Sequence, residues 1–157
     1  MAKWQNFSIW RGRLPHWRAD GVQYYATFRH KRPLEDAEMN LLFQRLMRAQ
    51  RRKFDYHILC VLPEKTEMIF TVNESPDGSP YELSDVIEKA KRQAGGAIIK
   101  KSQERWPPFY TECFDRIIRD EAEFEATWET ILSSPVDHEL VEDPSDWWTI
   151  FVPDAPE

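Results

Sequence analysis

The chain has 157 residues, of which 41% are hydrophobic and 13% aromatic, and its net charge at pH 7 is −6. This length and composition favour one globular domain, 1–157, with a core of its own. No apolar stretch approaches the roughly 20 residues that span a bilayer, and no apolar leader follows the start, so we expect a cytoplasmic protein without membrane contact. The two cysteines, Cys60 and Cys113, lack the CxxC spacing of zinc or redox sites.

The charge is distributed unevenly along the chain. Residues 1–53 carry 12 Lys and Arg against 4 acids, whereas residues 106–157 carry 2 against 14. Such asymmetry can produce a basic face that attracts a polyanion such as nucleic acid, even on an acidic protein. The alternative is that the acidic last third folds back and neutralises the basic half.

The first third of the chain predicts an arm, a strand and a helix. Residues 1–20 form a basic aromatic arm in which tryptophans and arginines alternate without a regular period. Residues 22–29 are rich in β-branched and aromatic side chains, which favours a strand. Residues 34–52 place apolar side chains three to four apart, with acids early and arginines late, and therefore predict a helix.

The middle of the chain predicts a β-hairpin followed by a helix. Residues 55–63 and 66–72 are two strands joined by a turn around residues 63–65. A helix is predicted from Ser84, an acceptable N-cap, through residue 101, and the alternative is that the glycine pair at 95–96 ends or kinks it.

The last third predicts one more strand and one more helix. Residues 105–119 begin as an extended aromatic segment, and residues 120–134 form a helix that Pro135 closes. An acidic aromatic tail, 137–157, completes the chain. The order β-α-β-β-α-β-α predicts an α+β fold of the ferredoxin-like kind, a four-stranded antiparallel sheet with helices on one face. This topology hosts many functions, so the fold alone names none.

Three stretches, in this order, are similar to one family. Residues 12–29 match an N-terminal signature in which Leu-Pro-His-Trp precedes a glycine and a strand ending Thr-Phe-Arg. Residues 57–63 resemble the strand that leads into a catalytic histidine pair. Residues 109–148 resemble a C-terminal half with a Phe-Asp-Arg run and a helix ending in Pro-Val. Together they resemble the REP-associated tyrosine transposases, which belong to the single-tyrosine HUH transposases.

The resemblance implies cleavage and rejoining of single-stranded DNA. In the family, a histidine pair on the central strand binds a divalent metal ion that polarises the scissile phosphate, and a helix tyrosine attacks to give a 5′-phosphotyrosine intermediate. Two imidazoles two residues apart on one strand point to the same face and can share one ion. The tyrosine must be positioned in line with the bond that breaks.

The residues that carry this chemistry are missing at the matching positions. Aligned on residues 62–64, Lys65 and Glu67 stand where the family has its two histidines. Aligned on residues 135–136, Thr130 stands where the family has its tyrosine. Because metal ligands and nucleophile are lost together while flanking motifs are kept, we expect an inactive scaffold without a cofactor. Mg²⁺ or Mn²⁺ is expected only if the ancestral activity survives.

No other residues replace the lost site convincingly. Glu67 and His57 lack the third carboxylate that a metal centre for a hard cation needs, and we expect His57 to make a structural hydrogen bond. Lys65 offers an ammonium at the place of the metal, where it can contact a phosphate directly. The alternative for Lys65 is that it only solvates the hairpin.

The remaining functional candidates are the basic and aromatic residues of the N-terminal half. Arginines hold phosphates while interleaved aromatic rings stack on bases. The predicted DNA-binding set is Trp10, Arg11, Arg13, His16, Trp17, Arg18, Arg29, Lys31, Arg32 and Lys65. Further cations late in the first helix are Arg45, Arg48, Arg51, Arg52 and Lys53.

The sequence therefore predicts a catalytically inactive, transposase-like protein that binds single-stranded or hairpin DNA and would then be associated with the nucleoid. The resemblance favours a monomer. The alternative is a protein-interaction module that has lost both catalysis and DNA binding, with the acidic C-terminal half as the surface for a protein partner.

Overall fold

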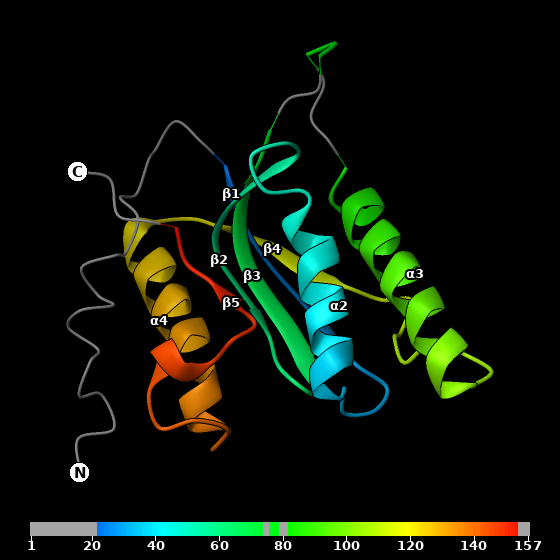
Figure 1. Ribbon diagram of the computed structural model, residues 1–157. Coiled ribbons are helices and arrows are strands. Elements are labelled where there is room, and N and C mark those ends of the chain that lie inside the picture. Colours follow the sequence, from blue (N-terminus) through cyan, green and yellow to red (C-terminus); the bar gives the residue numbers. More distant parts are fainter. Residues whose placement is uncertain (1–21, 74–75, 79–81, 154–157) are drawn as a thin grey trace.

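A computed structural model of the chain describes residues 22–73, 76–78 and 82–153 (Figure 1). The elements in order are β1 (Gln23–Arg29), α2 (Asp36–Met47), β2 (Phe54–Val61), β3 (Lys65–Val72), α3 (Leu83–Ser102), β4 (Phe114–Ile118), α4 (Glu121–Asp137), the 3-10 turn η1 (Pro144–Asp146) and β5 (Ile150–Phe151). The predicted order is confirmed through α4. None of the described helices is long and apolar enough to cross a membrane.

The strands form one antiparallel sheet in the order β4-β1-β3-β2-β5. β2 and β3 are the predicted hairpin. The prediction of four strands omits β5, whose residues Ile150 and Phe151 pair with Cys60 and Leu59. A strand of two residues shows no period in the sequence, so pattern alone could not reveal it.

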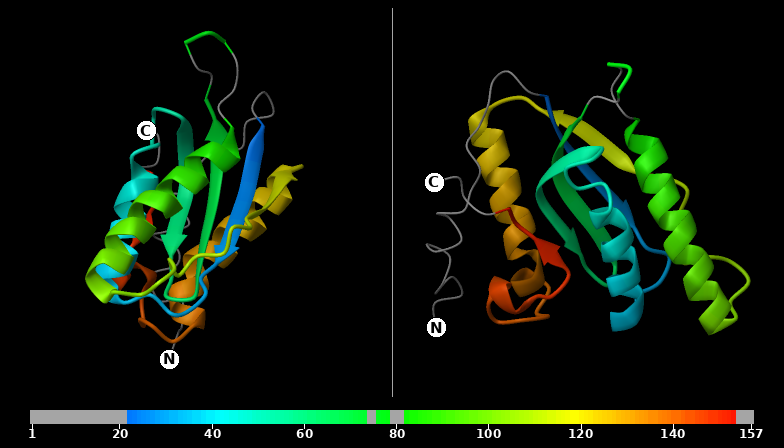
Figure 2. Two further views of the ribbon diagram at one scale, coloured as in Figure 1. Left: turned by 90° about the vertical axis from the view of Figure 1, so that its right-hand side faces the viewer. Right: turned by 45° about the horizontal axis from the view of Figure 1, so that its top comes forward.

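Helices cover both faces of the sheet, which corrects the prediction of a single covered face. α2 and α3 lie side by side on one face and α4 lies on the other (Figures 1 and 2). Neighbouring residues of β2 point to opposite faces. The Tyr56 hydroxyl donates to Leu46 O of α2 at 2.8 Å, whereas the ring of His57 packs on Phe124 of α4. The buried run at the end of β2 requires cover on both sides.

The core has one aromatic cluster on each side of the sheet. Under α2, Phe54 stacks on Phe70 with ring centroids 4.3 Å apart. On the other side of the sheet, Trp128 of α4 is fully buried and its Nε1 donates to His57 O at 3.1 Å. α4 is therefore anchored to the central strands by one large side chain and one buried hydrogen bond.

α3 runs through the glycine pair to Ser102, so the alternative that the glycines end it does not hold. Gly95 is required there because a Cβ would lie 2.8 Å from Cβ of Pro107. α4 continues past Pro135 to Asp137, since a proline in the last turn interrupts few helical hydrogen bonds.

Candidate nucleic-acid interface

The three positions that differ from the family's catalytic residues come together beside α4. Lys65 and Glu67 are two residues apart on β3 and project from the same face. Glu67 and Thr130 line one cavity of about 230 Å³ between the sheet and α4, together with Tyr25 and Arg116. Lys65 lies next to this cavity through its ion pair with Glu67.

Glu67 is a buried carboxylate that is bonded on both of its oxygens. The Tyr25 hydroxyl donates to Oε2 at 2.9 Å and the Ser134 hydroxyl donates to Oε1 at 3.1 Å. Lys65 Nζ lies 3.4 Å from Oε1, and the Glu67 side chain is only 6% exposed. A buried charge is tolerated when it is paired and its lone pairs are satisfied. Glu67 therefore ties β1, β3 and α4 together.

Tyr25 acts in this cavity as a hydrogen-bond donor. Burial, followed by the negative charge of Glu67, raises the pKa of Tyr25 to about 12. The Arg116 guanidinium lies over the Tyr25 ring, 5.0 Å from its centroid, and pairs with Glu123 of α4. At neutral pH the phenol keeps its proton, which makes it a poor nucleophile.

The side chains of this cavity do not fit a divalent metal ion. In the part of the chain that the structure describes, no three His, Cys, Asp or Glu side chains are placed to hold one. A hard cation needs several oxygen ligands, whereas Glu67 is flanked by the Lys65 ammonium. His57 makes a hydrogen bond to Thr71 Oγ1 at 2.8 Å, which is the structural role expected of it. No step through a metal follows from these residues.

Thr130 is an exposed side chain whose hydroxyl bonds within its own helix. Its Oγ1 donates to Ala126 O at 2.8 Å, one turn earlier in α4. This is a common local bond of a helical threonine. The hydroxyl occupies the position of the expected tyrosine without its reach or its acidity.

A second cavity continues along β1 toward the edge of the sheet. Tyr25, Thr27 and Arg29 alternate onto the same face of β1, and Arg29 lines a cavity of about 380 Å³ with Tyr110 and Phe114. Phe114 is 59% exposed and Tyr110 is 42% exposed. These two rings were missing from the predicted interface, because the sequence does not reveal which strand lies at the edge of the sheet.

Two of the predicted DNA-binding cations border this second cavity. Lys31 Nζ lies 5.7 Å from the centroid of the Tyr110 ring. Arg29 is directly opposite Lys65 in the pairing of β1 with β3. Like charges in such a cross-strand pair repel each other, and a bound anion would relieve that repulsion. Exposed rings beside cations are the arrangement that holds unpaired nucleotides.

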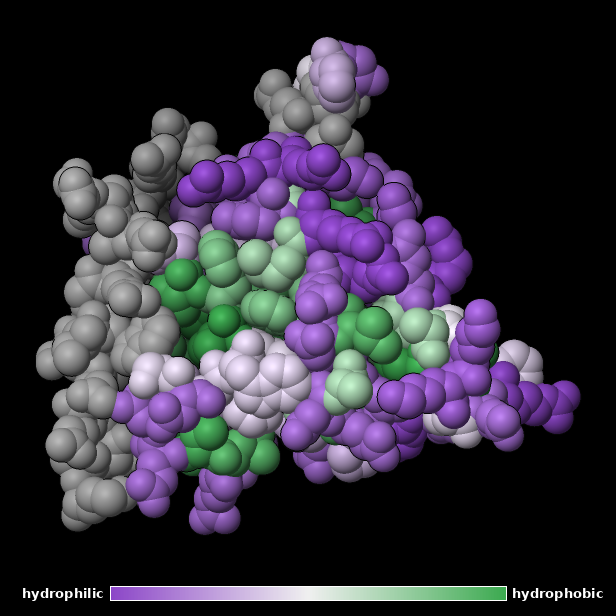
Figure 3. Space-filling view, viewed as in Figure 1, coloured by the Kyte–Doolittle hydropathy of each residue, from purple (hydrophilic) through white to green (hydrophobic). Residues whose placement is uncertain are grey.

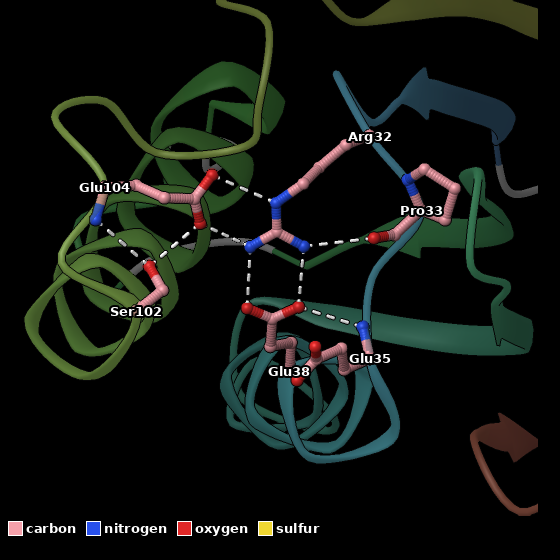
Figure 4. Close-up of polar contacts among 6 residues, drawn as sticks. All are labelled: Arg32, Pro33, Glu35, Glu38, Ser102 and Glu104. Atoms are coloured by element: carbon pink, nitrogen blue, oxygen red, sulfur yellow. Dashed lines mark hydrogen bonds and ion pairs between the residues drawn. The ribbon is translucent and has the colours of Figure 1, made fainter.

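Arg32, which the sequence pattern assigns to DNA binding, forms a structural clamp instead (Figure 4). All five of its N–H groups donate, to both carboxylate oxygens of Glu38, to both of Glu104, and to Pro33 O. Hydrogen bonds from Arg32 lower the pKa of Glu104 to about 2 and also lower the pKa of Glu38. Arg32 joins α2 to the end of α3, and no N–H remains for a phosphate.

The arm residues of the predicted interface, Trp10, Arg11, Arg13, His16, Trp17 and Arg18, lie outside the described residues. Among the described residues, the predicted DNA-binding side chains that can still contact a phosphate are therefore Arg29, Lys31 and Lys65. Arg29 and Lys31 are exposed, and Lys65 is one-third exposed.

The fold is shared with a solved transposase structure. No protein-family model matches the sequence, and no curated protein is similar enough to count as a relative. A REP-associated tyrosine transposase bound to a REP hairpin is 20% identical, with a TM-score of 0.63 over 84% of this chain and 77% of that chain. A candidate transposase from Deinococcus radiodurans R1 is 14% identical, with a TM-score of 0.49 over 76% and 94% of the two chains.

The chain thus has a transposase-type α+β fold. In particular, it has the fold of the REP-associated tyrosine transposase, which confirms at the level of the fold the resemblance stated from the sequence.

Proposed function

We propose that this protein is a catalytically inactive, transposase-like protein that binds single-stranded or hairpin DNA on the face of the sheet that carries α4. One observation carries the proposal: Glu67 and Thr130 line one cavity, and Glu67 is bonded there to Tyr25 and Ser134 and paired with Lys65. That site holds a structural ion pair where cleavage would need a metal ion and a nucleophile.

The absence of cleavage follows from what phosphodiester chemistry requires. An attacking hydroxyl needs charge neutralisation at the phosphoryl oxygens and a position in line with the leaving group. Lys65 supplies one positive charge, part of which the adjacent Glu67 cancels. Thr130 bonds its own helix, and Tyr25 keeps its proton.

DNA is the proposed ligand because cations and exposed rings occur together along β1. Arg29 and Lys31 would hold phosphates, and Tyr110 and Phe114 would stack on unpaired bases. Further DNA contacts are proposed for the arm residues Trp10, Arg11, Arg13, His16, Trp17 and Arg18. The solved transposase of the same fold is bound to a hairpin, which supports a hairpin with unpaired flanks as the form of DNA.

A protein-interaction module is the second candidate function. The observation that favours it is the acidity of α4, whose first turn carries Glu121 and Glu123 and whose N-cap is Asp120. These carboxylates would repel a phosphate backbone. Ile117 on the edge strand β4 is 53% exposed, which would suit a protein partner.

Fluorescence anisotropy across a salt series separates the two candidates. Labelled hairpin and single-stranded oligonucleotides are expected to bind with affinity that falls steeply as salt rises. In the double variant Arg29→Gln/Lys31→Gln, the salt slope for a single strand should become less negative by roughly 1.4, about 0.7 for each lost phosphate contact. Phe114→Ala should weaken single-strand binding by about 1 to 3 kcal/mol.

The matched control is Lys100→Gln/Lys101→Gln, which removes two charges from the last turn of α3. This control is expected to retain the affinity of the unmodified protein for single strands. Oligonucleotide binding no tighter than that of serum albumin at low salt would exclude DNA as the ligand and favour the interaction module.

A further inference from the structure

A basic groove lies between the C-terminal end of α2 and the first half of α3, on the face of the sheet opposite α4. Its volume is about 210 Å³, and the cations that line it are Arg45, Arg48, Arg52, Lys53 and Lys89. The other described side chains of its lining are neutral, and none is aromatic. Hydrophilic side chains cover this end of the two helices in Figure 3. We call it the α2/α3 groove.

Hydrogen bonds hold the backbone of the turn that follows α2. The carbonyl of Ala49 accepts from the backbone N–H groups of Arg52, Lys53 and Phe54 at 2.9 to 3.1 Å. Arg51 has a φ of 64°, in the left-handed region that costs most residues about 1 kcal/mol or more. Because the backbone of the turn is fixed, only the side chains have to become ordered when an anion binds.

Helix stability does not account for all five cations. Positive side chains in the last turn of a helix interact favourably with its dipole, which explains Arg45 and Arg48 at the end of α2. Arg52 and Lys53 lie beyond that helix. Lys89 lies in the second turn of α3, toward the positive end of that helix, where the dipole gives no reason for a cation.

We propose that the α2/α3 groove binds the phosphate backbone of base-paired nucleic acid. One guanidinium group can bind two oxygens of the same phosphate. Positive charge alone is enough for a groove to bind the backbone of a duplex without regard to its sequence. Without an aromatic side chain the groove cannot stack unpaired bases. It also lacks the Trp and Tyr anchors that, together with Arg, dominate protein interfaces. The inference does not depend on whether the α4 face binds DNA.

The test is anisotropy of a labelled, blunt DNA duplex with the double variant Arg48→Gln/Arg52→Gln. Both side chains are exposed, and thermal melting checks that the variant folds. Its salt slope should be less negative by roughly 1.8, about 0.9 for each lost phosphate contact in B-DNA. Affinity for the duplex should fall about tenfold at low salt. Lys100→Gln/Lys101→Gln, on the same helix but outside the groove, should retain full affinity.

Four results would overturn the proposal. The first is that the unmodified protein does not bind the duplex at low salt. The second is that Arg48→Gln/Arg52→Gln binds the duplex with unchanged affinity. The third is that the Lys100→Gln/Lys101→Gln control loses as much duplex affinity as Arg48→Gln/Arg52→Gln does. The fourth is a polyglutamate peptide that displaces the duplex more effectively than unlabelled duplex does, which would assign the groove to an acidic protein. Both double variants, Arg48→Gln/Arg52→Gln and Arg29→Gln/Lys31→Gln, are measured with the blunt duplex and with the single strand, so that a failure of the groove can be told from a failure of the α4 face.

Discussion

Replacing Glu67 by alanine is expected to lower the free energy of unfolding by about 3 kcal/mol. The substitution removes the carboxylate that accepts from the Tyr25 and Ser134 hydroxyls. It also removes the partner of the Lys65 ion pair. Unsatisfied buried donors each cost about 1 to 3 kcal/mol. Urea denaturation at neutral pH, followed by far-ultraviolet circular dichroism, measures the change.

Glu64→Ala is the matched control, because Glu64 is an exposed acid in the same hairpin. It should change stability by no more than about 0.5 kcal/mol. Tyr25→Phe and Ser134→Ala remove one donor each and should cost about 1 kcal/mol apiece. If Glu67→Ala proved as stable as the unmodified protein, the carboxylate would be free of a structural role, and the explanation for the altered site would be wrong.

Replacing Trp128 by alanine is expected to lower the free energy of unfolding by about 3 to 5 kcal/mol. This is the largest effect among the single substitutions that we propose. Trp128 has no exposed surface, and its Nε1 supplies the hydrogen bond to His57 O that links α4 to β2. Its removal leaves a large cavity and an unsatisfied carbonyl. Urea denaturation again gives the magnitude.

Trp128→Phe separates packing from hydrogen bonding at this position. It keeps most of the ring volume but removes the donor, so a loss of about 1 to 2 kcal/mol is expected. A loss in Trp128→Ala no greater than that in Trp128→Phe would mean that α4 does not depend on this side chain for its anchorage.

Local pattern predicted most of the fold, and tertiary pairing decided the rest. The β2–β3 hairpin and the helix centres follow from periodicity and turn residues. Two features were beyond that method. β5 exists only because Ile150 and Phe151 lie against β2, and α4 covers the second face because the buried run in β2 needs it.

The candidate site was predictable in its positions but not in its bonding. The resemblance to the transposase motifs assigns Lys65, Glu67 and Thr130 to one site. The donors to Glu67 come from Tyr25, 42 residues away, and Ser134, 67 residues away, and no local pattern indicates such pairs. The bonding of Arg32 could not be predicted for the same reason, since one of its carboxylate partners, Glu104, is 72 residues distant.

The most direct test of the proposed function is a search for a covalent protein–DNA adduct. The protein is incubated with labelled hairpin and single-stranded oligonucleotides in the presence of Mg²⁺ or Mn²⁺, under conditions where anisotropy shows binding, and the mixture is run on a denaturing gel. Binding without a retarded, denaturation-resistant band is the predicted result. A band that requires the metal ion and disappears on protease treatment would contradict the account.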